Sequence, residues 1–346
     1  MKHLFTNDYS SLAHPLILEA LINLKEEQNV AYGLDQYSLK AESYIKNIFN
    51  SPNGKVFFLS GGTMTNLLFI SYALRPYEAV IALESAHINV HETGAIEGTD
   101  HKIITVKGDN GKIKPFEILE VIKNYPNEHM VKPKLVYISN STEIGTIYTK
   151  DELLAIQQVC KENDLYFYID GARLGSALTS KENDVLPSLL GSVCDAFYIG
   201  GAKNGLLQGE ALVINNPALQ KDFRYHIKNK GAMVSKGYFL GAQFERAFRD
   251  NLYFAIAKQT NDIADYLKEQ LNLLNIAMLP SPTNQIFAIF SKEDATLLVR
   301  ECGLEVWEER KESIIVRFVT SFTTKKEDVD MLINFVKCHI KKEEAI

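Results

Sequence analysis

The chain is poor in cysteine and has no long apolar run. Its 346 residues include four cysteines, which lie far apart and form no Cys-x-x-Cys pair, so the sequence predicts neither a disulfide framework nor a thiolate zinc site. No stretch of about eighteen apolar residues is present, and the first residues lack the apolar segment of a signal peptide. We therefore expect a cytoplasmic protein with free thiols and no membrane partner.

A basic surface is also missing. The formal net charge is -6 and lysines and arginines do not cluster, so we expect no nucleic-acid partner. The composition, with 46% hydrophobic and 23% charged residues, is that of an ordinary globular protein. Because 346 residues are many for a single hydrophobic core, we expect a large domain over residues 1–245 and a smaller one over residues 246–346.

Helical and strand patterns alternate at short spacing along most of the chain. This alternation predicts an α/β large domain with a mostly parallel sheet, followed by a smaller α+β carboxyl-terminal domain. The expected strands are 56–59, 79–83, 102–106, 135–139, 165–170, 196–200 and 211–215, with 286–290 and 314–318 in the final portion. We expect ligands at the carboxyl ends of the parallel strands.

Two of these strands deliver a charged residue at that end. One runs from Tyr166 to Asp170 and is followed by Gly-Ala-Arg173, and the other leads into Gly-Gly-Ala-Lys203. Pyridoxal phosphate needs a lysine for its Schiff base and a carboxylate that keeps the pyridine nitrogen protonated. Together, Lys203 and Asp170 predict a pyridoxal phosphate site.

Other residues near strand ends suit the same cofactor. Gly61-Gly62-Thr63 lies between a strand and a helix, where backbone N–H groups can bind a phosphate, although a Gly-Gly pair is also typical of a simple tight turn. His87 follows strand 79–83 and could stack on the pyridine ring, or be a structural histidine. Arg173 and Arg317 could pair with a substrate carboxylate.

The spacing of two histidines also permits a metal site as an alternative. His87 and His91 are four residues apart and Glu92 is adjacent, a spacing that can hold a metal on a helix. No third ligand cluster or helical Glu-x-x-His partner accompanies them, so we predict no metal.

With these motifs the sequence resembles the threonine aldolase family, in particular low-specificity L-threonine aldolases, which are pyridoxal phosphate enzymes of the aspartate aminotransferase fold type I. The resemblance covers nearly the whole chain. The matching segments are 32–35, 61–66, 87–95, 170–173, 201–205 and 317–321. It implies an aspartate aminotransferase-like fold and a β-hydroxy amino acid substrate.

The resemblance also implies a role for each site residue. Lys203 would carry the cofactor, Asp170 would pair with its pyridine nitrogen, and His87 would stack on its ring. Gly62 and Thr63 would hold the phosphate. The substrate carboxylate would bind Asn7, Arg173 and Arg317, with Arg173 also facing the cofactor, and His129 would lie near the substrate side chain. Family members are typically homotetramers with sites between two subunits, where Lys228 and the basic stretch to Lys236 would contact a neighbour's phosphate.

The implied reaction is retro-aldol cleavage of L-threonine or L-allo-threonine to glycine and acetaldehyde. The base would be His87, His129 or a water that one of them holds. The chain departs from the family where Ser139-Asn-Ser-Thr-Glu143 replaces the common Glu-Asn-Thr-His-Asn, and where Ala202 precedes the lysine. Phenylserine aldol cleavage, β-elimination, transamination and a non-catalytic cofactor-binding or scaffold role remain alternatives.

Overall fold

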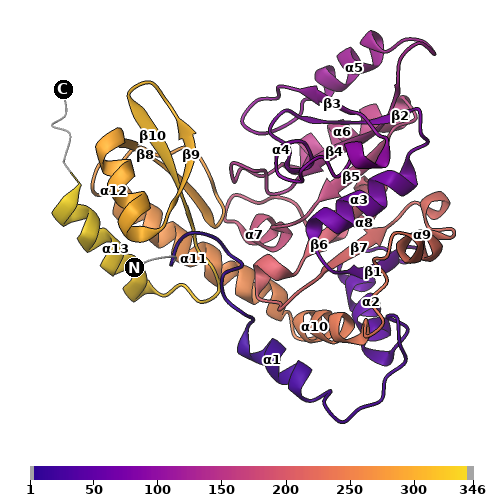
Figure 1. Cartoon of the computed structure of the whole chain (residues 1–346), viewed down its shortest axis with the longest axis horizontal. Helices are drawn as coiled ribbons and strands as arrows, with labels where there is room; N and C mark the ends of the chain where they lie inside the picture. The colour runs from indigo at the N-terminus through magenta and orange to yellow at the C-terminus, as the bar shows by residue number, and fades with distance from the viewer. Residues whose placement is uncertain (1–3, 341–346) are drawn as a thin grey trace.

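The computed structural model describes residues 4–340, which form two lobes around two sheets (Figure 1). The large lobe holds a seven-stranded sheet of order β1-β7-β6-β5-β4-β2-β3, and the small lobe a three-stranded sheet of order β8-β10-β9. The first seven strands are β1 (Lys55–Leu59), β2 (Glu78–Leu83), β3 (Ile103–Val106), β4 (Lys132–Ser139), β5 (Tyr166–Asp170), β6 (Ala196–Gly200) and β7 (Glu210–Ile214). The small-lobe strands are β8 (Gln285–Ser291), β9 (Glu305–Glu309) and β10 (Ser313–Val319).

The large sheet is mostly parallel, as predicted. Strands β3, β2, β4, β5 and β6 pair in parallel, while β7 runs antiparallel to both β6 and β1. The small sheet is antiparallel throughout. The central strands are almost fully buried because helices cover both faces of the sheet (Figure 1).

Helices connect the strands and cover them. In the large lobe they are α1 (Pro15–Ile22), α2 (Gln36–Ile48), α3 (Gly62–Ala73), α4 (His87–Val90), α5 (Pro115–Asn124), α6 (Lys150–Glu162), α7 (Leu174–Thr179), α8 (Leu190–Val193), α9 (Phe223–Asn229) and α10 (Tyr238–Arg249). Helix α11 (Leu252–Asn272) continues to the small lobe, which adds α12 (Lys292–Cys302) and α13 (Lys326–His339). None of the helices within residues 4–340 is long and apolar enough to cross a membrane.

Each lobe has its own cluster of buried apolar side chains, and α11 belongs to both. Tyr253 near its start packs in the large-lobe cluster, whereas Leu267 packs in the small-lobe cluster. Phe5 also belongs to the small-lobe cluster, and its carbonyl oxygen accepts the Val319 N–H at 2.8 Å. The amino-terminal segment is thus tied to the small lobe, and the division at residues 245 and 246 stays a prediction.

Candidate active site

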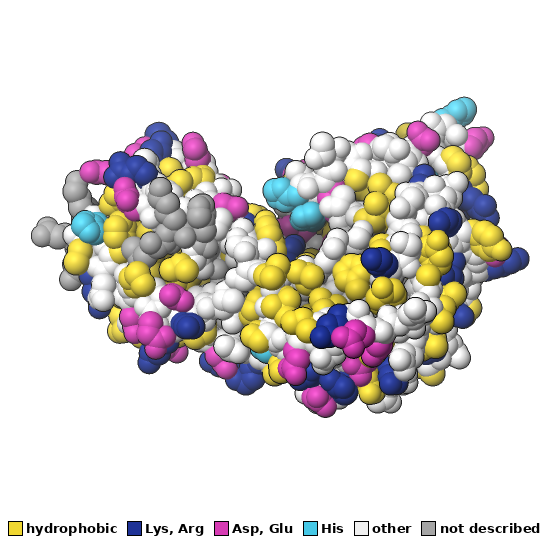
Figure 2. Space-filling view, turned by 60° about the horizontal axis from the view of Figure 1, so that its bottom comes forward, with side chains coloured by type: hydrophobic (Ala, Val, Ile, Leu, Met, Phe, Trp, Pro, Cys, Tyr) yellow, Lys and Arg dark blue, Asp and Glu magenta, His cyan; other side chains and the backbone are white. Residues whose placement is uncertain are grey.

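The predicted strand-end residues meet in one cavity of about 370 Å³. Figure 2 shows a hollow between the lobes with histidine side chains at its margin, and both His87 and His91 line the cavity. The walls include six of the predicted residues: Gly62, Thr63, His87, Asp170, Arg173 and Lys203. The cavity therefore lies at the carboxyl ends of β2, β4 and β5 and beside the loop that follows β6, as expected for an open α/β sheet.

Lys203 lies in a short 3-10 helix, η3 (Ala202–Asn204), directly after β6. A side chain at Gly201 would clash with the Gly209 carbonyl oxygen, which would lie 2.4 Å from its Cβ, so only glycine permits this path of the chain. Burial and the neighbouring Arg173 lower the pKa of Lys203, against the opposing charges of Asp8, Asp170 and Glu210. A lowered pKa increases the neutral, nucleophilic form of the amine.

Asp170 ends β5 and is held by three donors. Its Oδ2 accepts the Tyr137 hydroxyl at 2.6 Å and the Asn66 amide at 3.0 Å, and its Oδ1 accepts the Ala172 N–H at 2.9 Å. The residue is 3% exposed. These contacts fix the carboxyl group in one orientation at the cavity wall.

His87 begins α4 and is held by a buried carboxyl group. Its Nδ1 lies 2.8 Å from Glu92 Oε1, which also accepts the Asn66 amide at 2.8 Å. Asn66 therefore links the partner of His87 to Asp170. Among the described residues no group of three or more histidine, cysteine, aspartate or glutamate side chains is arranged to hold a metal ion.

Arg173 forms a bidentate ion pair with Asp8, a partner that the sequence did not indicate. The Arg173 Nε lies 2.7 Å from Asp8 Oδ2, and its Nη2 lies 3.0 Å from Oδ1. Burial raises the pKa of Asp8, but the charge and hydrogen bonds of Arg173, together with the charge of Lys203 and the Asn284 amide, lower the pKa overall. The neighbouring Asn7 instead accepts hydrogen bonds from the Tyr9 N–H and the Ser10 hydroxyl, and Tyr9 lines the cavity.

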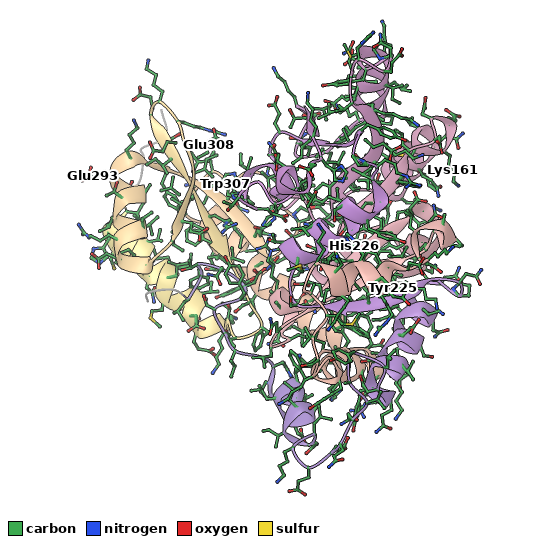
Figure 3. All side chains as sticks on the ribbon, turned by 45° about the vertical axis from the view of Figure 1, so that its right-hand side comes forward. Lys161, Tyr225, His226, Glu293, Trp307 and Glu308 are labelled. Atoms are coloured by element: carbon green, nitrogen blue, oxygen red, sulfur yellow. The ribbon has the colours of Figure 1, made fainter. Side chains whose placement is uncertain are left out.

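Arg317 lies across the hollow, on β10 of the small lobe. It pairs with Glu305 of β9, and its guanidinium lies 5.5 Å from the centre of the Trp307 ring. Figure 3 shows Trp307 on the side of the small lobe that faces the large lobe. The Nε of Arg317 is buried and has no hydrogen-bond partner. Arg317 does not line the cavity, although it is close enough for its charge to lower the pKa of His91, which does.

His129 and Lys228 lie outside the cavity of their own chain. His129 is exposed in the loop before β4, whereas the cavity lies at the opposite end of this eight-residue strand, roughly 25 Å away. A single chain therefore does not bring His129 to the cavity, and its role near the substrate side chain stays a prediction. Lys228 lies on α9, beside the residues Tyr225 and His226 that Figure 3 labels, and its Nζ is 5.1 Å from the centre of the Tyr32 ring.

Sequence reasoning did not assign several polar residues that the structure places at the site. They are Asp8, Asn66, Glu92, Tyr137, Glu143 and Glu210. Glu210 begins β7 and its Oε2 accepts the Gly201 N–H at 2.7 Å. Burial raises the pKa of Glu210 to about 8, although that hydrogen bond and the charge of Lys203 oppose the shift. In the sequence, only the position of Glu210 at the start of a strand, shortly after the lysine loop, indicated that it could lie at the site.

The residues of the cavity fit pyridoxal phosphate. Helix α3 begins at the cavity, and its N-cap, Gly61, makes no side-chain capping bond, so N–H groups at this end are available to an anion. A side chain at Gly61 would meet no atom within 4 Å, so the backbone there is open to a ligand. The amine with a lowered pKa and the fixed Asp170 carboxyl group line the same space.

Known proteins that are similar to this chain include several threonine aldolases. Residues 8–293 match the family model described as beta-eliminating lyase. The low specificity L-threonine aldolase of Pseudomonas aeruginosa is 31% identical over 83% of this chain and 84% of its own length. The solved structure of Leishmania major threonine aldolase is 42% identical, covers 96% of this chain and 98% of its own, and superposes with a TM-score of 0.94.

More distant structures share the fold alone. Cystalysin from Treponema denticola, whose structure contains pyridoxal 5'-phosphate, is 15% identical and superposes with a TM-score of 0.73 over 97% of this chain and 91% of its own. The arrangement of two lobes and a mostly parallel sheet is therefore that of fold type I enzymes, as predicted.

Proposed function

The chain belongs to the beta-eliminating lyase family, and on that premise we propose that it is a pyridoxal phosphate-dependent aldolase that cleaves L-threonine and L-allo-threonine to glycine and acetaldehyde. The observation that carries the proposal is the single cavity that holds Lys203, Asp170, His87 and the amino-terminal end of α3. The related threonine aldolases support this reaction over other amino acid chemistry.

Each residue has a defined task in this proposal. Lys203 attaches the cofactor, Gly62 and Thr63 bind its phosphate, His87 stacks on its ring, and Asp170 pairs with its pyridine nitrogen. When bound, pyridoxal phosphate supplies a sink for the electron pair left on Cα as the Cα–Cβ bond breaks. The three donors on Asp170 keep its carboxyl group aimed into the site through this change of charge.

The substrate carboxylate binds between the lobes. Arg173 of the large lobe and Arg317 of the small lobe both present guanidinium groups, which suit a carboxylate. Asn7 is a further contact of the substrate carboxylate in this proposal. Its chain neighbours support this, because Asp8 pairs with Arg173 and Tyr9 lines the cavity. The buried, unpartnered Nε of Arg317 supports a ligand on this side.

Purified protein with added cofactor tests the proposal. We expect a visible absorbance band from cofactor attached to Lys203, and no such band in Lys203→Ala. Aldehyde release from L-threonine and L-allo-threonine should accompany it, without the ammonia and keto acid that β-elimination or transamination would yield. A preparation that stays colourless with added cofactor, or that releases ammonia in place of aldehyde, would contradict the proposal.

We also propose a cytoplasmic homotetramer with sites between subunits. The free, buried cysteines Cys160, Cys194 and Cys302 suit a reducing compartment. Exposed apolar side chains near the amino terminus, including Leu12, Ile22 and Val30, suit a subunit interface. Lys228 and the segment to residue 236 lie outside the cavity of their own chain and are thus free to contact the cofactor phosphate in a neighbouring subunit. Sedimentation tests the tetramer, and Lys228→Ala should weaken cofactor binding if this contact forms.

A further inference from the structure

Glu143 is a carboxyl group of the cavity wall to which no role above is assigned. It follows β4 in the segment that departs from the family pattern, and its half-buried side chain lines the same cavity as His87 and Lys203. Its Oε1 accepts two hydrogen bonds, from the His87 backbone N–H at 3.0 Å and from the Ser139 hydroxyl at 2.7 Å. Two donors on one oxygen fix the orientation of the carboxyl group beside His87.

The other carboxyl oxygen of Glu143 is available. Oε2 has no hydrogen-bond partner within residues 4–340, and it is not among the fully buried atoms that lack one. Because the residue lines the cavity, this oxygen can accept a hydrogen bond from a bound molecule. The site therefore contains a rigidly held acceptor with one free oxygen.

The surroundings make Glu143 a stronger base than an exposed glutamate. Burial raises its pKa, and the charge of Asp170 on β5 adds to that, whereas the Ser139 hydroxyl and the backbone N–H groups of Glu143 itself and of His87 act in the opposite direction. The other titratable or charged groups that face this cavity are Tyr137 of β4, His87, His91 and Glu92 in and after α4, and Tyr9, Asp170, Arg173, Tyr198, Lys203 and Glu210. A base is most effective when its pKa lies near the working pH.

The two histidines expected as the base, His87 and His129, are less suited to this task. His87 directs Nδ1 to Glu92 and is assigned to the cofactor ring, and His129 lies beyond the far end of β4. Glu143 combines a place in the cavity wall with a free acceptor atom.

We propose that Glu143 is the general base that removes the β-hydroxyl proton of the substrate, an inference that rests on the proposed aldolase function. The hydroxyl O–H bond breaks and its proton moves to Glu143 Oε2. As the Cα–Cβ bond breaks, the hydroxyl oxygen and Cβ become the carbonyl of acetaldehyde, and the electron pair remains on Cα. Protonation of Cα then gives glycine, and Glu143 returns its proton to solvent.

The variant Glu143→Gln tests this assignment in the holoenzyme. The glutamine keeps an Oε1 acceptor for the His87 N–H and the Ser139 hydroxyl but cannot take up a proton at neutral pH. We expect the kcat for aldehyde release from L-threonine to fall by roughly 10²- to 10⁴-fold. Deuterium exchange at Cα of glycine, which has no β-hydroxyl group, should stay close to the wild-type rate. The exposed Glu84→Gln serves as the matched control and should leave both rates unchanged.

Two further measurements identify the proton acceptor. The wild-type kcat/KM should fall as the pH drops through the pKa of Glu143, because the protonated carboxyl group cannot act as a base, and this limb should be missing from Glu143→Gln. In isotope-edited infrared spectra of the holoenzyme, a protonated carboxyl band should titrate over the same pH range and be absent from the variant.

Distinct outcomes would overturn the inference. Wild-type cleavage by Glu143→Gln would exclude Glu143 as the base, and equal losses of cleavage and glycine exchange would assign it a positioning role only. If the wild-type enzyme itself binds the cofactor and exchanges glycine but releases no aldehyde, the proposed function fails, and this inference fails with it.

Discussion

The ion pair between Asp8 and Arg173 makes a quantitative prediction for the variant Asp8→Asn. The Asp8 side chain is fully buried and that of Arg173 is 13% exposed, so the substitution leaves a buried guanidinium without its counterion. Removing one partner of a buried ion pair costs about 3–5 kcal/mol. Asp8 also accepts the Asn284 amide at 2.9 Å, so the variant disturbs a contact that joins the amino-terminal segment to both lobes.

This loss should be visible in the thermal midpoint. With about 2.1 cal/mol/K of unfolding entropy per residue, 3–5 kcal/mol lowers the midpoint of a 346-residue chain by roughly 4–7 °C. The measurement is thermal unfolding followed by circular dichroism at pH 7. Asp109→Asn is the matched control, because Asp109 forms an exposed ion pair with Lys114 and its loss should change the midpoint little.

The pH dependence gives an independent check. The folded-state pKa of Asp8 lies below the ordinary value of 3.8, so its contribution to stability is present above that pH and is lost as the pH falls through the folded pKa. The midpoints of wild type and Asp8→Asn should therefore converge only in acid. The reasoning would be refuted if Asp8→Asn had the same thermal midpoint as the Asp109→Asn control. It would also be refuted if the difference in midpoint between wild type and Asp8→Asn were the same at all pH values.

Three further predictions concern the site and its support. Asp170→Asn should lower aldehyde release by about 10²- to 10³-fold with an unchanged circular dichroism spectrum, since it removes a charge that stabilises the reacting state. Gly171→Ala should lower the unfolding midpoint, because its Cβ would lie 1.9 Å from the Tyr198 carbonyl oxygen, whereas Gly98→Ala, with no atom within 4 Å, should not. Thr149→Ala should cost about 1 kcal/mol in urea unfolding, because the Thr149 hydroxyl caps α6.

Each of these has a clear contrary result. Full turnover by Asp170→Asn would remove that carboxyl group from the mechanism. Equal midpoints for the two glycine variants would show that the strand ends adjust to an added methyl group. A Thr149→Ala protein as stable as wild type would mean that solvent or Glu152 alone satisfies the first turn of α6.

The strands could be predicted because burial dictates their composition. All seven large-lobe strands contain short, mostly apolar runs, and each predicted range overlaps the observed one. Strand β9 was not expected, because three of its five residues, Glu305, Glu308 and Glu309, are acidic and it lies at the edge of the small sheet. Edge strands often carry charged side chains, so they lack the continuous apolar run that predicts a buried strand.

The site was only partly predictable for a related reason. Lys203 and Asp170 could be found because a strand end fixes where its next residue lies. The pair of Asp8 with Arg173 joins residues 165 positions apart, so only the tertiary fold reveals it. The place of His129 was hard to predict because it lies close in sequence to a strand that reaches the site, but before its amino end and not after its carboxyl end. Its role near the substrate side chain stays a prediction.

The continuous helix α11 limits how the two lobes can move. Its 21 residues span roughly 32 Å without a break, from the large-lobe core to the small-lobe core. The lobes are therefore connected by a rigid helix and not by a flexible linker. Closure over a substrate must occur as a small tilt or slide of packed helices. The guanidinium groups of Arg173 and Arg317, one on each lobe, are consequently held at a nearly fixed separation.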